Sequence, residues 1–386
     1  SLSMLEIRSQ RDLEILTKIY TDTVLLGDGG PHGWGIKYAT EFHMTNDSKL
    51  FIPRDKADEA GYRSDDYGRW IGPEGDVLLP LYEGRMIGQF DFSKKGWVSG
   101  KGRGAVWRDI PWEKKVLEPQ FTIRRGSFVE HSPGTAPHSR LAFMDVTAAT
   151  NTRTMVAAAL PPLPCGNSAP ILLSTQSPIA LALVLNSYAY DFVARARCGG
   201  LHPNSFVIEE TPLVSPCAVA PAVPMSVALA AAPALAPLIL ETSPGRLLRR
   251  AITPHERLRL RCILDAVVAA LYGLSRDDLR WILRDCDHPK ERLSDNAFCR
   301  TLDPKGFWRV DRDQDPELRH TVLTLVAFDV LDRLIAEHGG DRDAGVRAFC
   351  ELNASEGWML PGTMRLADHG LGQNARAGAP QPVASR

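Results

Sequence analysis

The stretch that most restricts the fold runs from Ser177 to Gly200, because it carries both a helix start and a helix stop. Ser177 is a favourable N-cap, and Pro178 suits the first helical position, where its missing N–H group has no intrahelical partner to lose. The pair Gly199-Gly200 ends the helix, since glycine enters the left-handed conformation without a steric penalty. We therefore expect one long helix, with one face formed by Ile179, Leu183, Ser187, Tyr190 and Val193.

A short strand and an uncharged segment follow this helix. Ser205 to Glu209 alternates enough to predict a strand, and the prolines after it prevent its extension. Thr211 to Leu240 contains no charged residue, as a membrane span would, but six prolines interrupt it. Each proline costs a helix interior about 3 kcal/mol. We therefore expect a Pro/Ala-rich linker over residues 216–245 and no membrane partner.

The part of the chain before this linker reads as an α/β domain over residues 1–215. Apolar and β-branched residues predict strands at Phe121–Val129, Leu141–Val146 and Arg153–Leu160. Together with Ser205–Glu209, these strands predict a mixed sheet that carries the long helix.

The part after the linker has helical signals. Thr253-Pro254, Ser275 and Asp315-Pro316 each place a capping residue before a run of helical periodicity. These signals predict a smaller all-helical domain over residues 246–366, and the Gly, Ala and Pro content of residues 367–386 predicts a disordered tail. The expected class is therefore α+β.

Charge and cysteine content exclude some classes of protein. The net charge of -1 excludes a globally basic nucleic-acid-binding protein, although a locally basic face remains open. The seven cysteines are scattered without a C-x-x-C pair, which argues against a zinc site and a disulfide scaffold and for a reducing cytoplasm. The chain opens at Ser1 with no signal peptide, so we expect a cytoplasmic fragment of a longer protein.

A basic segment between Phe92 and Trp107 carries four cations and no acidic residue. Glycines separate the cations, and such a loop suits a phosphate backbone, because glycine permits close approach and each cation can displace a counterion. The alternative is a flexible, solvated hairpin loop. The candidate phosphate contacts are Lys94, Lys95, Lys101 and Arg103.

Motifs for catalysis or metal binding are weak. Gly100–Gly104 resembles a glycine-rich cofactor loop but does not lie between a clear strand and a helix. Asp91 with Glu113–Lys115 imitates a metal-nuclease site, yet an exposed, salt-bridged loop explains these residues as well. His131 and His138 flank a turn without a third metal ligand. We therefore expect no catalytic and no metal-binding residue in this chain.

Several stretches together resemble the C-terminal part of adenine-specific DNA methyltransferases of the type IIG-like restriction-modification and phage-defence kind. The stretches are EFHMTNDSKLF, LPLYEGRMIGQFDF, RLAFMDVTAATNTRTMVAAALPP and, as a fourth match, YDFVARARCGG, and the matches continue in order through residues 271–283 and 303–329. The arrangement also resembles, more loosely, the target-recognition domains of type I specificity subunits.

This sequence departs from the family where catalysis would lie. The family's catalytic Asn/Asp-Pro-Pro-Tyr/Phe motif is missing, because Leu160-Pro-Pro-Leu163 lacks the amide and the aromatic ring. The family's glycine-rich S-adenosylmethionine motif is missing as well. The resemblance thus implies a DNA target-recognition region without a cofactor of its own. The parent enzyme would use S-adenosylmethionine in a methyltransferase domain, with or without a nuclease, that precedes Ser1.

The resemblance implies double-stranded DNA as the partner. Arginine pairs naturally with guanine and asparagine with adenine in the major groove. The candidate groove contacts are Arg153, Arg195, Arg197, His202 and Asn204. Two other functions remain open: a metal-dependent nuclease that uses the Glu113 region, and a scaffold that docks other subunits without binding DNA.

Overall fold

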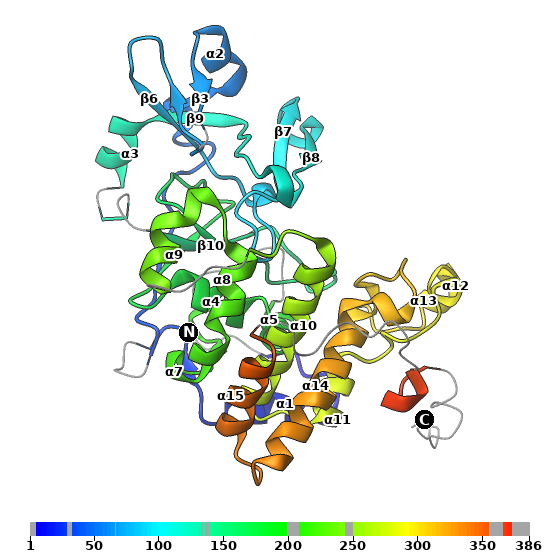
Figure 1. The fold of residues 1–386 in the computed structure, drawn as a ribbon. Helices are drawn as coiled ribbons and strands as arrows, with labels where there is room; N and C mark the ends of the chain where they lie inside the picture. The colour runs from blue at the N-terminus through cyan, green and yellow to red at the C-terminus, as the bar shows by residue number, and fades with distance from the viewer. Residues whose placement is uncertain are drawn as a thin grey trace.

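The protein has an α+β fold of helices and antiparallel sheets (Figure 1), and its buried apolar side chains form two large hydrophobic clusters and one small one. The computed structural model describes residues 5–28, 33–65, 67–132, 134–135, 139–198, 208–243, 250–354 and 366–372. The expected fold class and helical C-terminal region are confirmed. Within these ranges, no helix combines the length and apolarity that a bilayer crossing requires.

The central sheet has four short antiparallel strands in the order β11-β10-β12-β2. The strands are β2 (Lys37–Ala39), β10 (Arg140–Phe143), β11 (Ala157–Leu160) and β12 (Ile171–Leu173). Every residue of β10 and β11 is buried, because helices cover the sheet.

A second antiparallel sheet forms the upper part of Figure 1, with the strand order β3-β9-β6-β5-β4. It contains β3 (Phe51–Pro53), β4 (Arg63–Ser64), β5 (Trp70–Ile71), β6 (Val77–Pro80) and β9 (Phe121–Arg124), flanked by α2 (Arg54–Glu59) and α3 (Arg125–His131). The strand predicted for 121–129 thus ends at Arg124, where α3 begins. Of the strands expected in one mixed sheet, the one at 121–129 lies in this sheet, and those at 141–146 and 153–160 lie in the central sheet.

A two-stranded ribbon stands beside the second sheet (Figure 1). Its strands are β7 (Lys95–Ser99) and β8 (Val106–Asp109), which pair with each other and with no other described strand. The basic segment predicted as a loop is therefore a β-hairpin. A further short pair joins β1 (Val24–Leu25) to β13 (Pro212–Leu213).

The expected long helix is two helices, α4 (Pro178–Leu185) and α5 (Tyr188–Arg197). The break lies at Asn186, whose side chain exchanges two hydrogen bonds with the backbone of Ala157, at 2.8 and 3.0 Å. The Ser187 hydroxyl then accepts from the Tyr190 N–H group and caps α5. The predicted Gly199-Gly200 stop and most of the predicted strand 205–209 lie outside the described residues, although Ile208 and Glu209 are helical.

The segment expected as a linker is folded. It forms α7 (Pro216–Val219), α8 (Val223–Ala230) and α9 (Ala236–Thr242), each with a proline in its first turn, with short 3-10 turns Ala220–Ala222 and Pro233–Leu235 between them. Small apolar side chains let α8 pack against α4 and α10. The core therefore continues from the sheet region into the helical region without a gap.

The remaining helices occupy the lower and right-hand parts of Figure 1. They are α1 (Gln10–Tyr20), α10 (Pro254–Leu271), α11 (Arg276–Ile282), α12 (Lys290–Leu293), α13 (Asn296–Cys299), α14 (His320–Glu337) and α15 (Arg342–Leu352). Asp315 precedes a 3-10 turn, Pro316–Leu318, and α14 starts only at His320. In the region predicted as a tail, Leu371 is buried, and residues 373–386 lie outside the described residues.

Candidate nucleic-acid interface

A large basic cavity lies where the base of the β7–β8 ribbon meets the N-terminal half of α10. Its volume is about 1100 Å³, and its walls come from residues 85–95, 109–113, 144–156 and 252–261 and from Arg309. Seven cationic and three acidic side chains line it, so its walls carry an excess of four positive charges. The cations are Arg85, Lys94, Lys95, Arg153, Arg257, Arg261 and Arg309, and the acids are Asp91, Asp109 and Glu113.

Three of the predicted DNA contacts meet in this cavity, although they come from two separate stretches of sequence. Lys94, Lys95 and Arg153 all line it. Lys94 Nζ lies 3.1 Å from Asp109 Oδ1, and both side chains are at least half exposed, so this ion pair opens readily toward a phosphate. Lys95 begins strand β7 at the foot of the ribbon.

Arg153 is more enclosed than its predicted role requires. Its side chain is 9% exposed, and its Nε lies 2.9 Å from Asp191 Oδ2. Its guanidinium also donates to the Asn186 carbonyl and stacks 4.1 Å above the Tyr188 ring. Arg153 therefore adds positive charge to the cavity wall while its guanidinium is held by Asp191 and the Asn186 carbonyl.

Arg195 does not face a groove, and this prediction is wrong. It is 3% exposed, and its guanidinium donates to Asp191 Oδ1 and to the carbonyl oxygens of Lys305, Asn151 and Thr152. Burial lowers the pKa of Arg195, and the nearby Asp191 opposes that shift. These contacts join α5 to two loops, so Arg195 stabilises the fold.

Arg197 is likewise held inside the chain, contrary to the prediction. Its side chain is 8% exposed and donates to Glu210 Oε2 at 2.7 Å and to the Tyr20 hydroxyl at 2.6 Å. The two arginines that end α5 thus contact the protein rather than solvent.

The other predicted contacts divide between the ribbon and the undescribed residues. Lys101 is exposed at the tip of the ribbon, beside the 3-10 turn Gly102–Gly104. Arg103 lies within that turn, but its side chain is outside the described part of the structure. His202 and Asn204 fall in 199–207, also outside it.

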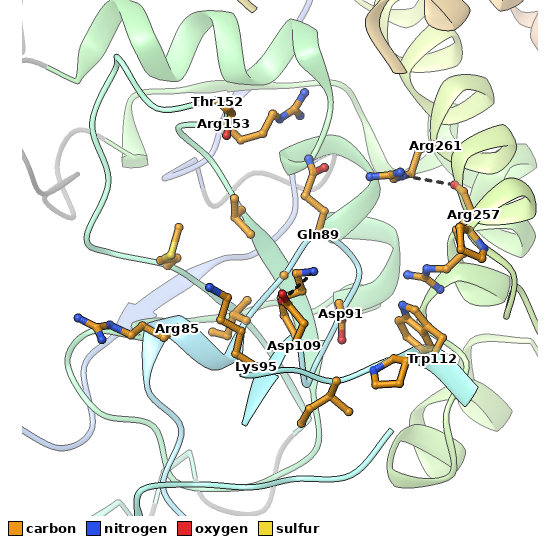
Figure 2. Close-up of a pocket in the computed structure, with 18 of the residues that line it drawn as sticks. Arg85, Gln89, Asp91, Lys95, Asp109, Trp112, Thr152, Arg153, Arg257 and Arg261 are labelled. Atoms are coloured by element: carbon orange, nitrogen blue, oxygen red, sulfur yellow. Dashed lines mark hydrogen bonds and ion pairs between the residues drawn. The ribbon is translucent and has the colours of Figure 1, made fainter. Parts of the chain in front are cut away.

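Arg257 and Arg261 were missed by the sequence analysis. Both project from α10 toward the cavity, whereas Arg85 and Lys95 lie on the far side (Figure 2). The Arg257 guanidinium stacks 3.6 Å above the Trp112 ring and donates to the Leu229 carbonyl at 2.7 Å. The pKa of Arg257 is lowered to about 9, mainly by burial and also by the positive charge of Arg261, while Asp91 opposes the shift. An anion in the cavity would relieve this repulsion.

Asp91 and Lys115 form a buried ion pair next to the cavity. Lys115 Nζ lies 2.8 Å from Asp91 Oδ2, and the two side chains are 1% and 7% exposed. Burial lowers the pKa of Lys115, and Asp91 raises it in opposition. The expected salt bridge is present, and Glu113 and Lys114 are exposed as expected, but the Asp91–Lys115 pair itself is buried and fixes the foot of the ribbon from inside.

The histidines suggested as metal ligands have other surroundings. His131 stacks on Phe42 with ring centroids 4.4 Å apart and bonds to the Glu41 carbonyl. His138, its suggested partner, lies outside the described residues. Among the residues that the structure describes, no group of three His, Cys, Asp or Glu side chains converges closely enough to hold a metal ion.

Comparison with known proteins gives no relative for this chain. No family model, no curated protein and no solved structure matches it.

Proposed function

We propose that this chain is the DNA-recognition portion of an adenine-specific DNA methyltransferase of the restriction-modification kind, and that it binds duplex DNA along the basic cavity and ribbon. The observation that carries the proposal is the charge of the cavity, with seven cations and three acids in a chain whose net charge is -1. Such a local excess attracts a polyanion even though the chain as a whole carries no net positive charge.

The shape of the site supports a nucleic acid over a small acidic ligand. Lys94 and Lys95 continue the positive charge from the cavity to the foot of the ribbon, and Lys101 extends it to the tip. A phosphate backbone can follow such a line of cations, and each contact releases a condensed counterion. Duplex DNA is thus held in register while a separate domain acts on the adenine.

The test is the salt dependence of DNA binding by the 386-residue chain, measured by fluorescence anisotropy with a labelled duplex. Arg85→Gln combined with Arg261→Gln should reduce the slope of log K against log salt by about 0.9 for each phosphate that is no longer neutralised. Lys56→Ala is the matched control, since Lys56 lies on the exposed helix α2 and does not line the cavity. An equal slope for all three proteins would overturn the proposal, as would an absence of binding at low salt.

The proposal includes no methyl transfer by this chain alone. Incubation with labelled S-adenosylmethionine and duplex DNA should give only background incorporation, because the two motifs that bind the cofactor and the target adenine are missing from the sequence. In the parent enzyme, the cofactor would bind the catalytic domain.

A second function, metal-dependent DNA cleavage, is favoured by one contact. Asp91 and Glu113 both line the cavity, and Lys115 lies against Asp91, as the Asp…Glu-x-Lys pattern requires. All three Lys115 donors are already used, however, by Asp91 and two carbonyl groups. Cleavage of a plasmid that requires Mg²⁺ and is abolished in Glu113→Gln would establish this second function.

A further inference from the structure

The tip of the ribbon has a fixed shape that only glycine permits. Gly100 has φ +79°, and a Cβ atom there would lie 2.4 Å from the Gly104 carbonyl oxygen. The Gly100 carbonyl in turn accepts from Trp97 Nε1 at 2.9 Å and from Gln120 Nε2 at 3.2 Å. The turn is therefore held in one conformation from the side of the protein.

The ribbon is also fixed along its length. Trp97 N–H donates to the Glu118 carbonyl at 2.8 Å, and Arg54 stacks 4.7 Å from the Trp97 ring. Arg108 makes two hydrogen bonds to the Glu118 carboxylate. With the Asp91–Lys115 pair at its foot, the ribbon is a preorganised projection rather than a flexible loop.

The outer residues of the ribbon combine apolar and cationic side chains. Val98 and Val106 are 45% and 53% exposed, and Lys101 is exposed between them. Ser99 pairs with Val106, and the register shift between Trp97 and Ser99 makes Val98 a bulge, which increases the local twist of the ribbon. The tip therefore offers an apolar contact beside a cationic one, which phosphate binding alone does not require.

We propose that the ribbon tip, residues 99–106, enters the major groove of duplex DNA and discriminates between base pairs. The major groove admits a two-stranded β-ribbon, and its edges offer both of the contacts that the tip provides. Val106 packs against the methyl group of a thymine, and the Lys101 ammonium donates to O6 and N7 of a guanine. The cations at the foot of the ribbon contact phosphates and set its register.

This inference deepens the proposed function and depends on it. Because Arg195 and Arg197 are held inside the chain, they are not available as readers of base edges. The foot of the ribbon lines the basic cavity, so a duplex bound there lies next to the ribbon. Sequence choice then resides in the tip, while the cavity supplies affinity.

In the experiment, the full chain selects from a pool of duplexes with about 20 random base pairs, and the bound duplexes are sequenced. This length exceeds the footprint of one ribbon in the groove. The tip variant combines Lys101→Ala with Val106→Ser, both exposed positions whose replacement leaves the core unchanged. The matched control combines Lys94→Ala with Lys95→Ala at the foot. Melting temperatures of both variants confirm that they fold.

We expect the wild-type chain to enrich a motif, and the tip variant to lose preference at two or three adjacent positions of it by roughly tenfold. The control should enrich the same motif with weaker binding and a flatter salt slope. Retention of the full motif by the tip variant overturns this inference and leaves the proposed function intact. Binding without any enriched motif overturns the inference and the recognition role together, and no binding to DNA overturns the proposed function itself.

Discussion

The ion pair between Asp91 and Lys115 is a buried contact that holds the foot of the ribbon. Lys115 Nζ donates to Asp91 Oδ2 at 2.8 Å and to the carbonyls of Ser93 and Ile110 at 2.7 and 2.6 Å. These acceptors lie next to the start of β7 and the end of β8. Asp91→Asn keeps the side-chain volume but removes the charge, and it leaves the ammonium group buried among neutral acceptors.

We expect Asp91→Asn to lower the free energy of unfolding by about 3–5 kcal/mol, because it leaves an uncompensated buried charge. That is a large share of the 5–15 kcal/mol, roughly, by which native proteins are stable. Arg257 increases the loss: burial lowers its pKa to about 9, and Asp91 is the neighbour that opposes this shift.

The loss should depend on pH in a direction that Lys115 sets. Burial holds the pKa of Lys115 below its ordinary value of 10.5 and Asp91 opposes this, so the pKa falls further in the variant. At pH values between the folded-state pKa of Lys115 and 10.5, Lys115 is protonated in the unfolded chain but not in the folded one. The free energy of unfolding therefore rises with pH in this range. The deficit of Asp91→Asn should thus be larger near neutral pH than at a pH about one unit below the ordinary lysine value.

Urea unfolding followed by tryptophan fluorescence at both pH values measures this deficit. Lys94→Met is the matched control, since it breaks an exposed lysine–aspartate pair in the same ribbon, and it should change stability by no more than about 0.5 kcal/mol. The reasoning is refuted if Asp91→Asn costs less than about 1 kcal/mol, or if its deficit grows as the pH rises.

Other substitutions test the remaining assignments. Arg195→Met should lower the melting temperature without changing the salt slope of DNA binding, because its donors serve an aspartate and backbone carbonyls; a flatter slope would return Arg195 to the DNA surface. Burial raises the pKa of Glu83 to about 7, so folding stability falls as pH rises from 4.5 to 7, and Glu83→Gln should be more stable above pH 7 by up to about 3 kcal/mol. Parallel stability–pH curves for the two proteins would contradict that assignment. Gly100→Ala should lower the melting temperature more than Gly102→Ala, since only at Gly100 does the added Cβ meet a backbone oxygen, and equal melting temperatures would mean that the turn is adaptable.

Helix starts were predictable where the signal is local. Ser275 forms a capping box with Asp278 at the start of α11, and the Thr253 hydroxyl accepts from the Glu256 N–H group at the start of α10. These contacts span three residues, so the sequence contains all the information that they need. The predicted positions of both helices are confirmed.

The break between α4 and α5 was not predictable in this way. The helical periodicity continues across it, and the residue that stops α4 acts through a strand 29 positions earlier in the chain. One signal in the sequence does identify the role of α4: all eight of its residues are apolar, and a helix that is apolar on every side is buried on every side.

The arginines of α5 illustrate a different limit. By itself, Arg195 suggests a cation on the protein surface. Its partner Asp191 lies four residues earlier, however, at the spacing of a helical ion pair. That pair was a local signal against a DNA contact. The partners of Arg197 gave no such signal, since Tyr20 lies 177 residues away.

The cavity itself shows why the expected boundary at 216–245 fails to separate DNA contacts from the helical region. Arg257 and Arg261 lie one turn apart on α10, where a sequence alone indicates a solvated helix face. They reach the cavity because α8, which belongs to the presumed linker, packs against α10 and holds it beside the foot of the ribbon. The Leu229 carbonyl, at the end of α8, then accepts from Arg257 and fixes its guanidinium over Trp112. The folded Pro/Ala segment thus connects two halves of one basic surface, and the helical region supplies part of the DNA interface that we propose.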